Sequence, residues 1–115
     1  MRQPYIDNEV KLQNSVYNDW HVLSVIGRID VTTSASVEEA GAAALDAAEK
    51  IAMDMSKTDY ISSAGLRVLL RLSKKAKRAK KTFVLFGASG IIQDVFAASG
   101  MDMLVTIYKS KDDLP

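Results

Sequence analysis

Two adjacent serines, Ser62 and Ser63, are the residues of this chain whose type and position best support chemistry. They follow a short apolar segment and a polar turn, and they stand where a predicted helix begins. A hydroxyl at a helix N-terminus lies beside unpaired backbone N–H groups and the positive end of the helix dipole. The same groups hold a phosphate placed there. The segment therefore predicts a phosphorylation switch, the alternative being that one serine only caps the helix.

The other residues of the chain give little support to catalysis or metal binding. A hydrolytic triad needs a base beside its nucleophile, but the only histidine, His21, lies in a predicted strand. Cysteine is absent, which excludes disulfides and thiolate chemistry. Asp54 and Asp59 have no His or Cys cluster near them, a pattern typical of caps or surface charges. We therefore expect a protein that is not an enzyme and needs no cofactor or metal.

Length and composition indicate one small globular domain. The chain has 115 residues, of which 48% are hydrophobic and 25% are charged. No apolar run approaches the roughly 18 residues that a membrane span requires. The first nine residues lack the apolar core of a secretion signal. We expect a single domain over residues 1–115, located in the cytoplasm and not bound to a membrane.

Charge is distributed unevenly, although the net charge is only +1. Residues 1–60 hold 5 Lys or Arg against 10 Asp or Glu, whereas residues 61–115 hold 10 against 4. Much of the positive charge lies between Arg67 and Lys81, and a basic stripe can attract nucleic acid. No aromatic residue interrupts this run, and only one predicted helix carries it. We interpret it as a solvated helix face, and we expect no direct binding of nucleic acid.

Hydrophobic periodicity predicts an alternation of strands and helices behind an N-terminal hairpin. Strands are predicted at residues 10–16, 20–26, 51–55, 82–86 and 105–108. Helices are predicted from Ser34 or Ser36 to about residue 50, from 63 to 79 and from 90 to 98. The buried side of the second helix is predicted to include Leu66, Leu69, Leu70 and Ala76, and the apolar side of the third to consist of Ile91, Ile92, Val95 and Phe96. Residues 27–33 are predicted to be a loop, and residues 109–115 a mobile polar tail. Strands separated by helices favour a largely parallel sheet, with the hairpin adding an antiparallel edge.

Three segments resemble the signature of the anti-sigma factor antagonists, the STAS domain family. Residues 54–66, Asp-Met-Ser-Lys-Thr-Asp-Tyr-Ile-Ser-Ser-Ala-Gly-Leu, resemble its strand that ends in Asp-Leu-Ser and leads to Asp-Ser-Ser-Gly-Leu. Gly27-Arg-Ile-Asp30 resembles the Gly-x-Leu-Asp after the second strand of the family. Residues 95–101 resemble the late helix that ends in Ser-Gly-hydrophobic. The resemblance extends over roughly residues 8–110.

The resemblance implies an α/β fold: a single STAS-like domain whose mixed, mostly parallel sheet has an N-terminal antiparallel strand and three to four helices. It also implies a regulatory binding protein. In this family the unmodified antagonist sequesters an anti-sigma factor that is also a serine kinase, phosphorylation ends the interaction, and a serine phosphatase restores it. An alternative is a non-phosphorylated STAS module that senses a ligand or scaffolds a larger signalling assembly.

The pattern of the family assigns the accepting hydroxyl to Ser63, with Ser62 as second choice. Ser62 stands where the family often has Asp, and Ala64 stands where it often has a second Ser. The second departure removes a competitor for phosphorylation, whereas the first adds one. The resemblance also implies an acidic loop residue near the acceptor. The expected partner-binding residues are Asp30, Ser62, Ser63, Ala64, Gly65 and Arg67.

Overall fold

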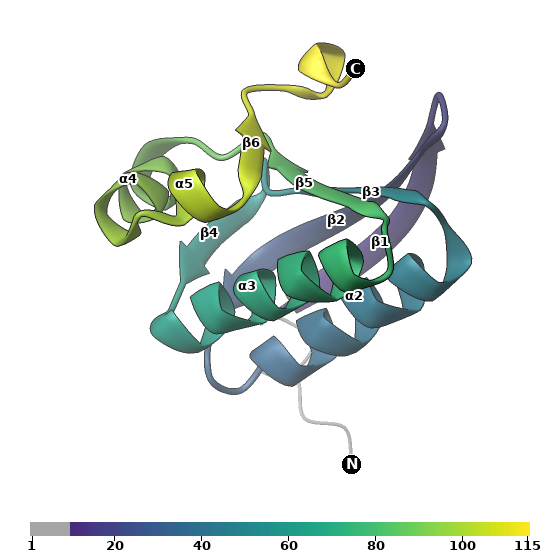
Figure 1. Ribbon diagram of the computed structural model, residues 1–115. Helices are drawn as coiled ribbons and strands as arrows, with labels where there is room; N and C mark the ends of the chain where they lie inside the picture. The colour runs from purple at the N-terminus through teal and green to yellow at the C-terminus, as the bar shows by residue number, and fades with distance from the viewer. Residues whose placement is uncertain (1–9) are drawn as a thin grey trace.

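A six-stranded mixed sheet organises residues 10–115, the part of the chain that the computed structural model describes (Figure 1). The strands are β1 (Val10–Tyr17), β2 (Trp20–Ile29), β3 (Lys50–Asp54), β4 (Thr58–Ile61), β5 (Thr82–Phe86) and β6 (Thr106–Tyr108). The helices are α2 (Ser34–Ala47), α3 (Ser63–Arg78), α4 (Gly90–Ser99) and α5 (Met101–Leu104), followed by the 3-10 helix η1 (Lys111–Asp113). Residues 1–9, in which the sequence shows no secretion signal, lie outside the described residues.

The main sheet order is β1-β2-β3-β5-β6, and β4 pairs with β2 beside this path. Among the described strands, β1 and β2 alone are antiparallel, because a two-residue turn joins them, whereas the pairs involving the later strands are parallel. The prediction of a mixed, mostly parallel sheet with an antiparallel N-terminal strand and three to four helices is confirmed, with four α-helices in residues 10–115.

The long strand β2 carries two partners in succession on the edge opposite β1. Its residues 21–24 pair with β3, and its residues 27–29 pair with β4. Strand β4 was not predicted, because Thr58, Asp59 and Tyr60 made the segment look like a polar turn. Thr58 is nevertheless buried, and its hydroxyl donates a 2.6 Å hydrogen bond to the Val25 carbonyl. Burial of this satisfied hydroxyl explains how a polar segment continues the sheet.

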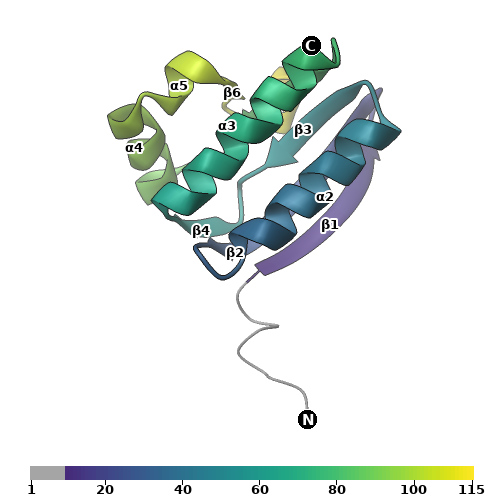
Figure 2. The same ribbon diagram turned by 60° about the horizontal axis from the view of Figure 1, so that its bottom comes forward.

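The helices cover one face of the sheet, and α2 and α3 run side by side across it (Figure 2). The main core lies between this face and the apolar sides of α2, α3 and α4. On α3 the core positions are Val68, Leu69, Leu72 and Ala76, so the prediction that Leu69 and Ala76 are buried is confirmed. Leu66 and Leu70, also predicted on this side, are half-buried at its margin. Helix α3 spans 63–78, one residue short of its prediction.

Several local predictions are wrong. Gly27–Ile29 continue β2 instead of entering a loop, because β4 offers them a pairing partner. Helix α2 begins at Ser34 after Thr33, whose side chain makes no capping bond, so neither Ser34 nor Ser36 is its cap. Ile91 is exposed, although its position on the apolar side of α4 was expected to be buried. Helix α5 is only 4 residues long and was too short to predict.

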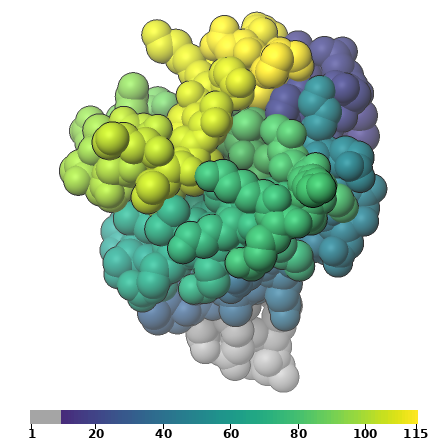
Figure 3. Space-filling model, viewed as in Figure 1, coloured from purple at the N-terminus to yellow at the C-terminus, as the bar shows by residue number. Residues whose placement is uncertain are grey.

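The second face of the sheet carries its own apolar cluster, which the C-terminal segment partly covers. The cluster consists of Trp20, Val22, Ala52, Val84 and Phe86. Leu114 packs against it, and the Trp20 indole N–H donates a 3.0 Å hydrogen bond to the Pro115 carbonyl. Figure 3 shows this segment beside the β1–β2 turn. The prediction of a mobile tail is therefore wrong, because the sheet offers this segment an apolar surface.

No helix within residues 10–115 combines the length and the apolar character that crossing a bilayer requires.

Candidate functional site

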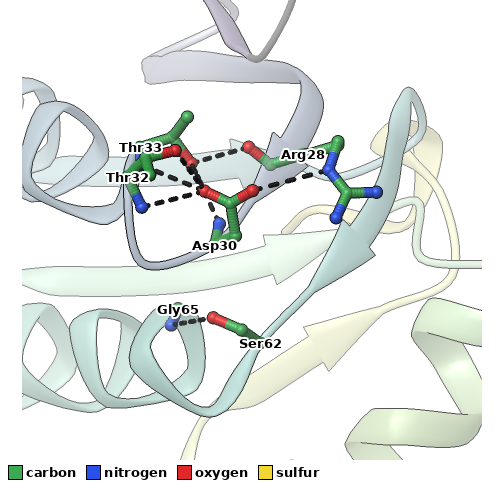
Figure 4. A network of polar contacts seen from close by, with 6 residues as sticks. All are labelled: Arg28, Asp30, Thr32, Thr33, Ser62 and Gly65. Atoms are coloured by element: carbon green, nitrogen blue, oxygen red, sulfur yellow. Dashed lines mark hydrogen bonds and ion pairs between the residues drawn. The ribbon is translucent and has the colours of Figure 1, made fainter.

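The candidate site forms where β2 and β4 end side by side (Figure 4). The last residues of the two strands, Ile29 and Ile61, pair in parallel register, and the Ser62 N–H donates a 2.8 Å hydrogen bond to the Ile29 carbonyl. The loop after β2 and the start of α3 therefore leave the sheet together. This pairing explains how Asp30 and Ser62, which are far apart in the sequence, come to lie at one end of the sheet.

The two serines have different roles at the start of α3. Ser62 has an extended backbone, with φ −91° and ψ 175°, and its hydroxyl accepts a 3.3 Å hydrogen bond from the Gly65 N–H. Ser62 is thus the N-cap of α3, a role that the sequence alone could not assign to either serine. Ser63 is the first helical residue and is exposed. No hydrogen bond to its side chain is found within residues 10–115.

Asp30 organises the loop between β2 and α2. Its Oδ1 accepts hydrogen bonds from the Thr32 hydroxyl at 2.7 Å and from the backbone N–H groups of Thr32 and Thr33 at 3.0 and 3.2 Å. Its Oδ2 lies 3.5 Å from Nε of Arg28. The Thr32 hydroxyl, with the backbone donors, holds the pKa of the Asp30 carboxyl below its usual value. The carboxylate therefore fixes the loop beside the serines.

Three further residues that the sequence did not assign to the site lie around it. The Arg28 guanidinium carbon is 4.2 Å from the centroid of the Tyr60 ring, across the β2–β4 pair. Tyr60 is 40% exposed and Val31 is 77% exposed, so both present apolar surface. Two signals were available in the sequence: an aromatic residue two positions before Ser62, and an apolar residue inside a polar loop.

Gly65 lies beneath the site and does not form part of its surface. A Cβ added to Gly65 would lie 2.8 Å from Cγ2 of Ile29 and 2.8 Å from Cγ1 of Ile61. The bare glycine therefore lets the first turn of α3 rest on the ends of both strands. Gly65 is itself buried and offers no exposed surface for a direct contact. Ala64 is half-buried, and Arg67 is exposed.

The cations near the start of α3 differ in their partners. The Arg71 guanidinium donates to both carboxylate oxygens of Glu38, at 2.7 and 2.9 Å. This bond lowers the pKa of the Glu38 carboxyl. Arg67 has no ion pair within residues 10–115. The first turn of α3 contains no acidic residue. The exposed hydroxyl of Ser63 thus lies on a helix whose first turn has no negative charge of its own.

Residues 10–114 match the sequence profile of the STAS domain. The chain is 30% identical over 87 residues to BtrV of Bordetella bronchiseptica, a protein named as a candidate anti-sigma factor antagonist, and the match covers 75% of each chain. It superposes with a TM-score of 0.83 on the crystal structure of an anti-sigma factor antagonist from Mycobacterium paratuberculosis, at 22% identity over 92% of this chain and 91% of that one. The Bacillus cell fate determinant SpoIIAA, in its phosphorylated form, superposes with a TM-score of 0.65 at 16% identity, over 90% of this chain and 94% of its own.

Proposed function

The chain belongs to the STAS domain family, and from this premise we propose that it is an anti-sigma factor antagonist. In this proposal the protein is a regulatory binding module that acts in the cytoplasm. It sequesters an anti-sigma factor that is also a serine kinase, and phosphorylation of Ser63 releases that partner. A serine phosphatase then restores the binding form. The names of the matching proteins support the general role, since they describe anti-sigma factor antagonists.

One observation carries the proposal: the Ser63 hydroxyl is exposed, while its neighbour Ser62 caps the helix. The reactive position is therefore not needed for the integrity of α3. A kinase can reach Ser63 without opening the fold, and modification leaves the capping bond of Ser62 in place. Asp30 and Val31 lie beyond the paired strand ends and extend the surface that a partner would contact.

The proposed switch is a transfer of one phosphoryl group. The Ser63 Oγ attacks the terminal phosphorus of a nucleoside triphosphate, its O–H proton leaves to a base of the kinase, and the nucleoside diphosphate departs. The product carries about −1.5 to −2 charges at neutral pH. If Ser63 lies in the centre of the interface, this charge is buried without a matching group on the partner. Such burial costs several kcal/mol, and each 1.4 kcal/mol weakens binding about tenfold.

Phosphorylation at this position is expected to leave the backbone nearly unchanged. The modified hydroxyl lies on the first residue of α3, where the N–H groups of the first turn favour an anion. The proposed regulation is therefore a change of surface charge and not a change of fold.

The test begins with the protein purified from its own host. Intact-mass measurement and site mapping at Ser62 and Ser63 determine whether a phosphate is present and where. Titration calorimetry with the anti-sigma factor kinases of that host, purified and tested singly, then compares the unmodified protein with Ser63→Ala and Ser63→Asp. We expect Ser63→Asp to weaken binding at least tenfold, and Ser63→Ala to bind but resist phosphorylation.

Ser15→Asp is the matched control, because Ser15 is exposed on β1 and pairs with Val22, near the opposite end of β2. It adds the same charge away from the site and should bind like the unmodified protein. Unchanged affinity of Ser63→Asp for a kinase that binds the unmodified protein would contradict the proposed switch.

A second candidate function, ligand sensing without phosphorylation, is favoured by a groove at the other end of α3. The groove has a volume of about 590 Å³, and its lining includes Lys77, Lys81 and Met103. The two functions make different predictions for the host protein. Ligand sensing requires a small molecule that copurifies with the chain and an unmodified Ser63, whereas partner switching requires a phosphorylated fraction.

A further inference from the structure

We propose that Arg67 is the intramolecular partner of a phosphate on Ser63, so that modification adds an anion to this surface and withdraws a cation from it. The inference rests on the proposed function, since it describes the regulation of the same site. It assigns Arg67 two states: available to an acidic group of the partner when Ser63 is unmodified, and paired with the phosphate when Ser63 is modified.

The spacing of the two residues on α3 brings them together. Ser63 is the first residue of the helix, and Arg67 follows four residues later. Residues four apart lie on one face of a helix, with Cβ atoms about 5–6 Å apart. Both residues are exposed. The fork of the guanidinium therefore reaches a phosphate on Ser63 without any change in the backbone.

Among the arginines near the site, Arg67 is also the one without a competing ionic partner in residues 10–115. Arg71, one turn further along α3, is held by both oxygens of Glu38. Arg28 lies against the Tyr60 ring and 3.5 Å from the Asp30 carboxylate. Arg67 makes no ion pair within residues 10–115. A phosphate on Ser63 therefore meets an arginine that gives up no ion pair with the described part of the chain.

The lack of acidic residues in the first turn of α3 indicates which group of a partner the unmodified surface would bind. No acidic residue lies in the first turn of α3, so the positive charge of Arg67 is not neutralised locally. An aspartate or glutamate of the partner is the complementary group. After phosphorylation, the phosphate on Ser63 takes the place of that carboxylate beside Arg67. The partner then no longer has Arg67 to bind and meets a negative charge at the same point.

Phosphorus NMR of the full chain tests the pairing without a kinase. Phosphoserine is incorporated at position 63 during translation, and the second pKa of the phosphate is measured by pH titration. A nearby guanidinium stabilises the dianion and lowers this pKa, so we expect Arg67→Gln to raise it by a few tenths of a pH unit. Arg71→Gln is the matched control and should leave it unchanged, because Arg71 is one turn further from Ser63 and is held by Glu38.

Two results would overturn the inference: a phosphate pKa that does not respond to Arg67→Gln, or an equal response to both arginine variants. Phosphoserine at position 62 provides a further control, since Arg67 is five residues away and Arg67→Gln should have no effect there. In the unmodified protein, Arg67→Gln should also weaken binding of the kinase identified above about tenfold. Unchanged binding would overturn the acidic-partner assignment. The NMR result does not depend on any partner, so its failure is separable from failure of the proposed function.

Discussion

At the scale of single residues, two adjacent serines with the same side chain perform different tasks because their backbones differ. Ser62 is extended and turns its hydroxyl to the Gly65 N–H, whereas Ser63 already belongs to the helix. The sequence could place a cap at one of the two positions but could not decide between them, since serine suits both. The pairing of Ser62 with Ile29 decides it, and this contact spans 33 positions of the chain.

Alanine substitutions should separate the two serines by their effect on stability. Ser62→Ala removes the cap, and we expect the free energy of unfolding to fall by about 1 kcal/mol. Ser63→Ala removes an exposed hydroxyl that makes no hydrogen bond with residues 10–115, and we expect a change within about 0.5 kcal/mol. Urea unfolding followed by circular dichroism measures both variants. Equal losses in the two variants would contradict the assignment of the cap.

The Asp30 carboxyl should make stability depend on pH. Its folded-state pKa is lowered, so its contribution is complete above the unfolded value, near 3.8, and is lost as the pH falls through the folded value. Asp30→Asn should be less stable than the unmodified protein by about 1 kcal/mol at pH 7, where the carboxylate accepts its hydrogen bonds. We expect this difference to shrink below about pH 4. Unfolding curves at pH 7, 5 and 3 measure it, and a constant difference would refute the role of the charge.

At the scale of elements, the accuracy of the sequence-based predictions depended on the strength of the local pattern. Thr82–Phe86 was predicted with the observed bounds, because it is nearly all apolar and is buried from Phe83 onward. The four residues of β4 were missed, because two of them face solvent and one is a buried threonine. The part of β2 that pairs with β4 was missed because it begins with a glycine and an exposed arginine. When a strand forms because a neighbouring strand is available for pairing, its own residues show little of the hydrophobic pattern from which strands are predicted.

The contact between α3 and the strand ends should be sensitive to a single methyl group. Gly65→Ala places a Cβ against Ile29 and Ile61 and against the Ile29 backbone oxygen at 3.0 Å. We expect a loss of about 1–3 kcal/mol in the free energy of unfolding.

Gly41→Ala is the comparison, since Gly41 is buried within α2 and its added Cβ would meet the methyl groups of Leu72. Those groups end a flexible side chain, and alanine favours the helix by about 1 kcal/mol over glycine. We expect a smaller loss than for Gly65→Ala. Urea unfolding measures the loss of unfolding free energy in both variants. Equal losses would contradict the inference that the close Ile29 backbone oxygen makes Gly65→Ala the more costly change.

At the scale of the whole molecule, the sheet has an apolar surface on each face, and within residues 10–115 the α-helices cover only one of them. Composition predicted a globular protein but could not show that the polar C-terminal segment partly covers the second face. The relevant contacts, from Leu114 and from the carbonyl of Pro115, link opposite ends of the sequence. A segment rich in Lys and Asp is expected to be solvated unless one of its apolar residues, here Leu114, packs against an apolar surface of the fold.

Trp20 provides a direct measure of this cover, because it is the only tryptophan and is 1% exposed. Leu114→Ala removes apolar contact over the second face, and we expect a shift of the Trp20 emission to longer wavelength and a loss of about 1 kcal/mol in stability. Leu104→Ala is the matched control, since Leu104 is 55% exposed and should change stability by no more than about 0.5 kcal/mol. An emission spectrum unaffected by Leu114→Ala would show that the segment does not cover the indole.

The sharing of β2 between β3 and β4 also has a consequence for how new specificities arise in such a protein. The half that pairs with β3 builds the interior, whereas the half that pairs with β4 ends at the buried Ile29 and leads into the loop that carries the exposed Val31. Substitutions at the exposed Val31 or Tyr60 change the surface of the site without disturbing the part of β2 that pairs with β3. Under the proposed function, duplicated copies of such a protein can therefore diverge in partner choice while they keep the same scaffold.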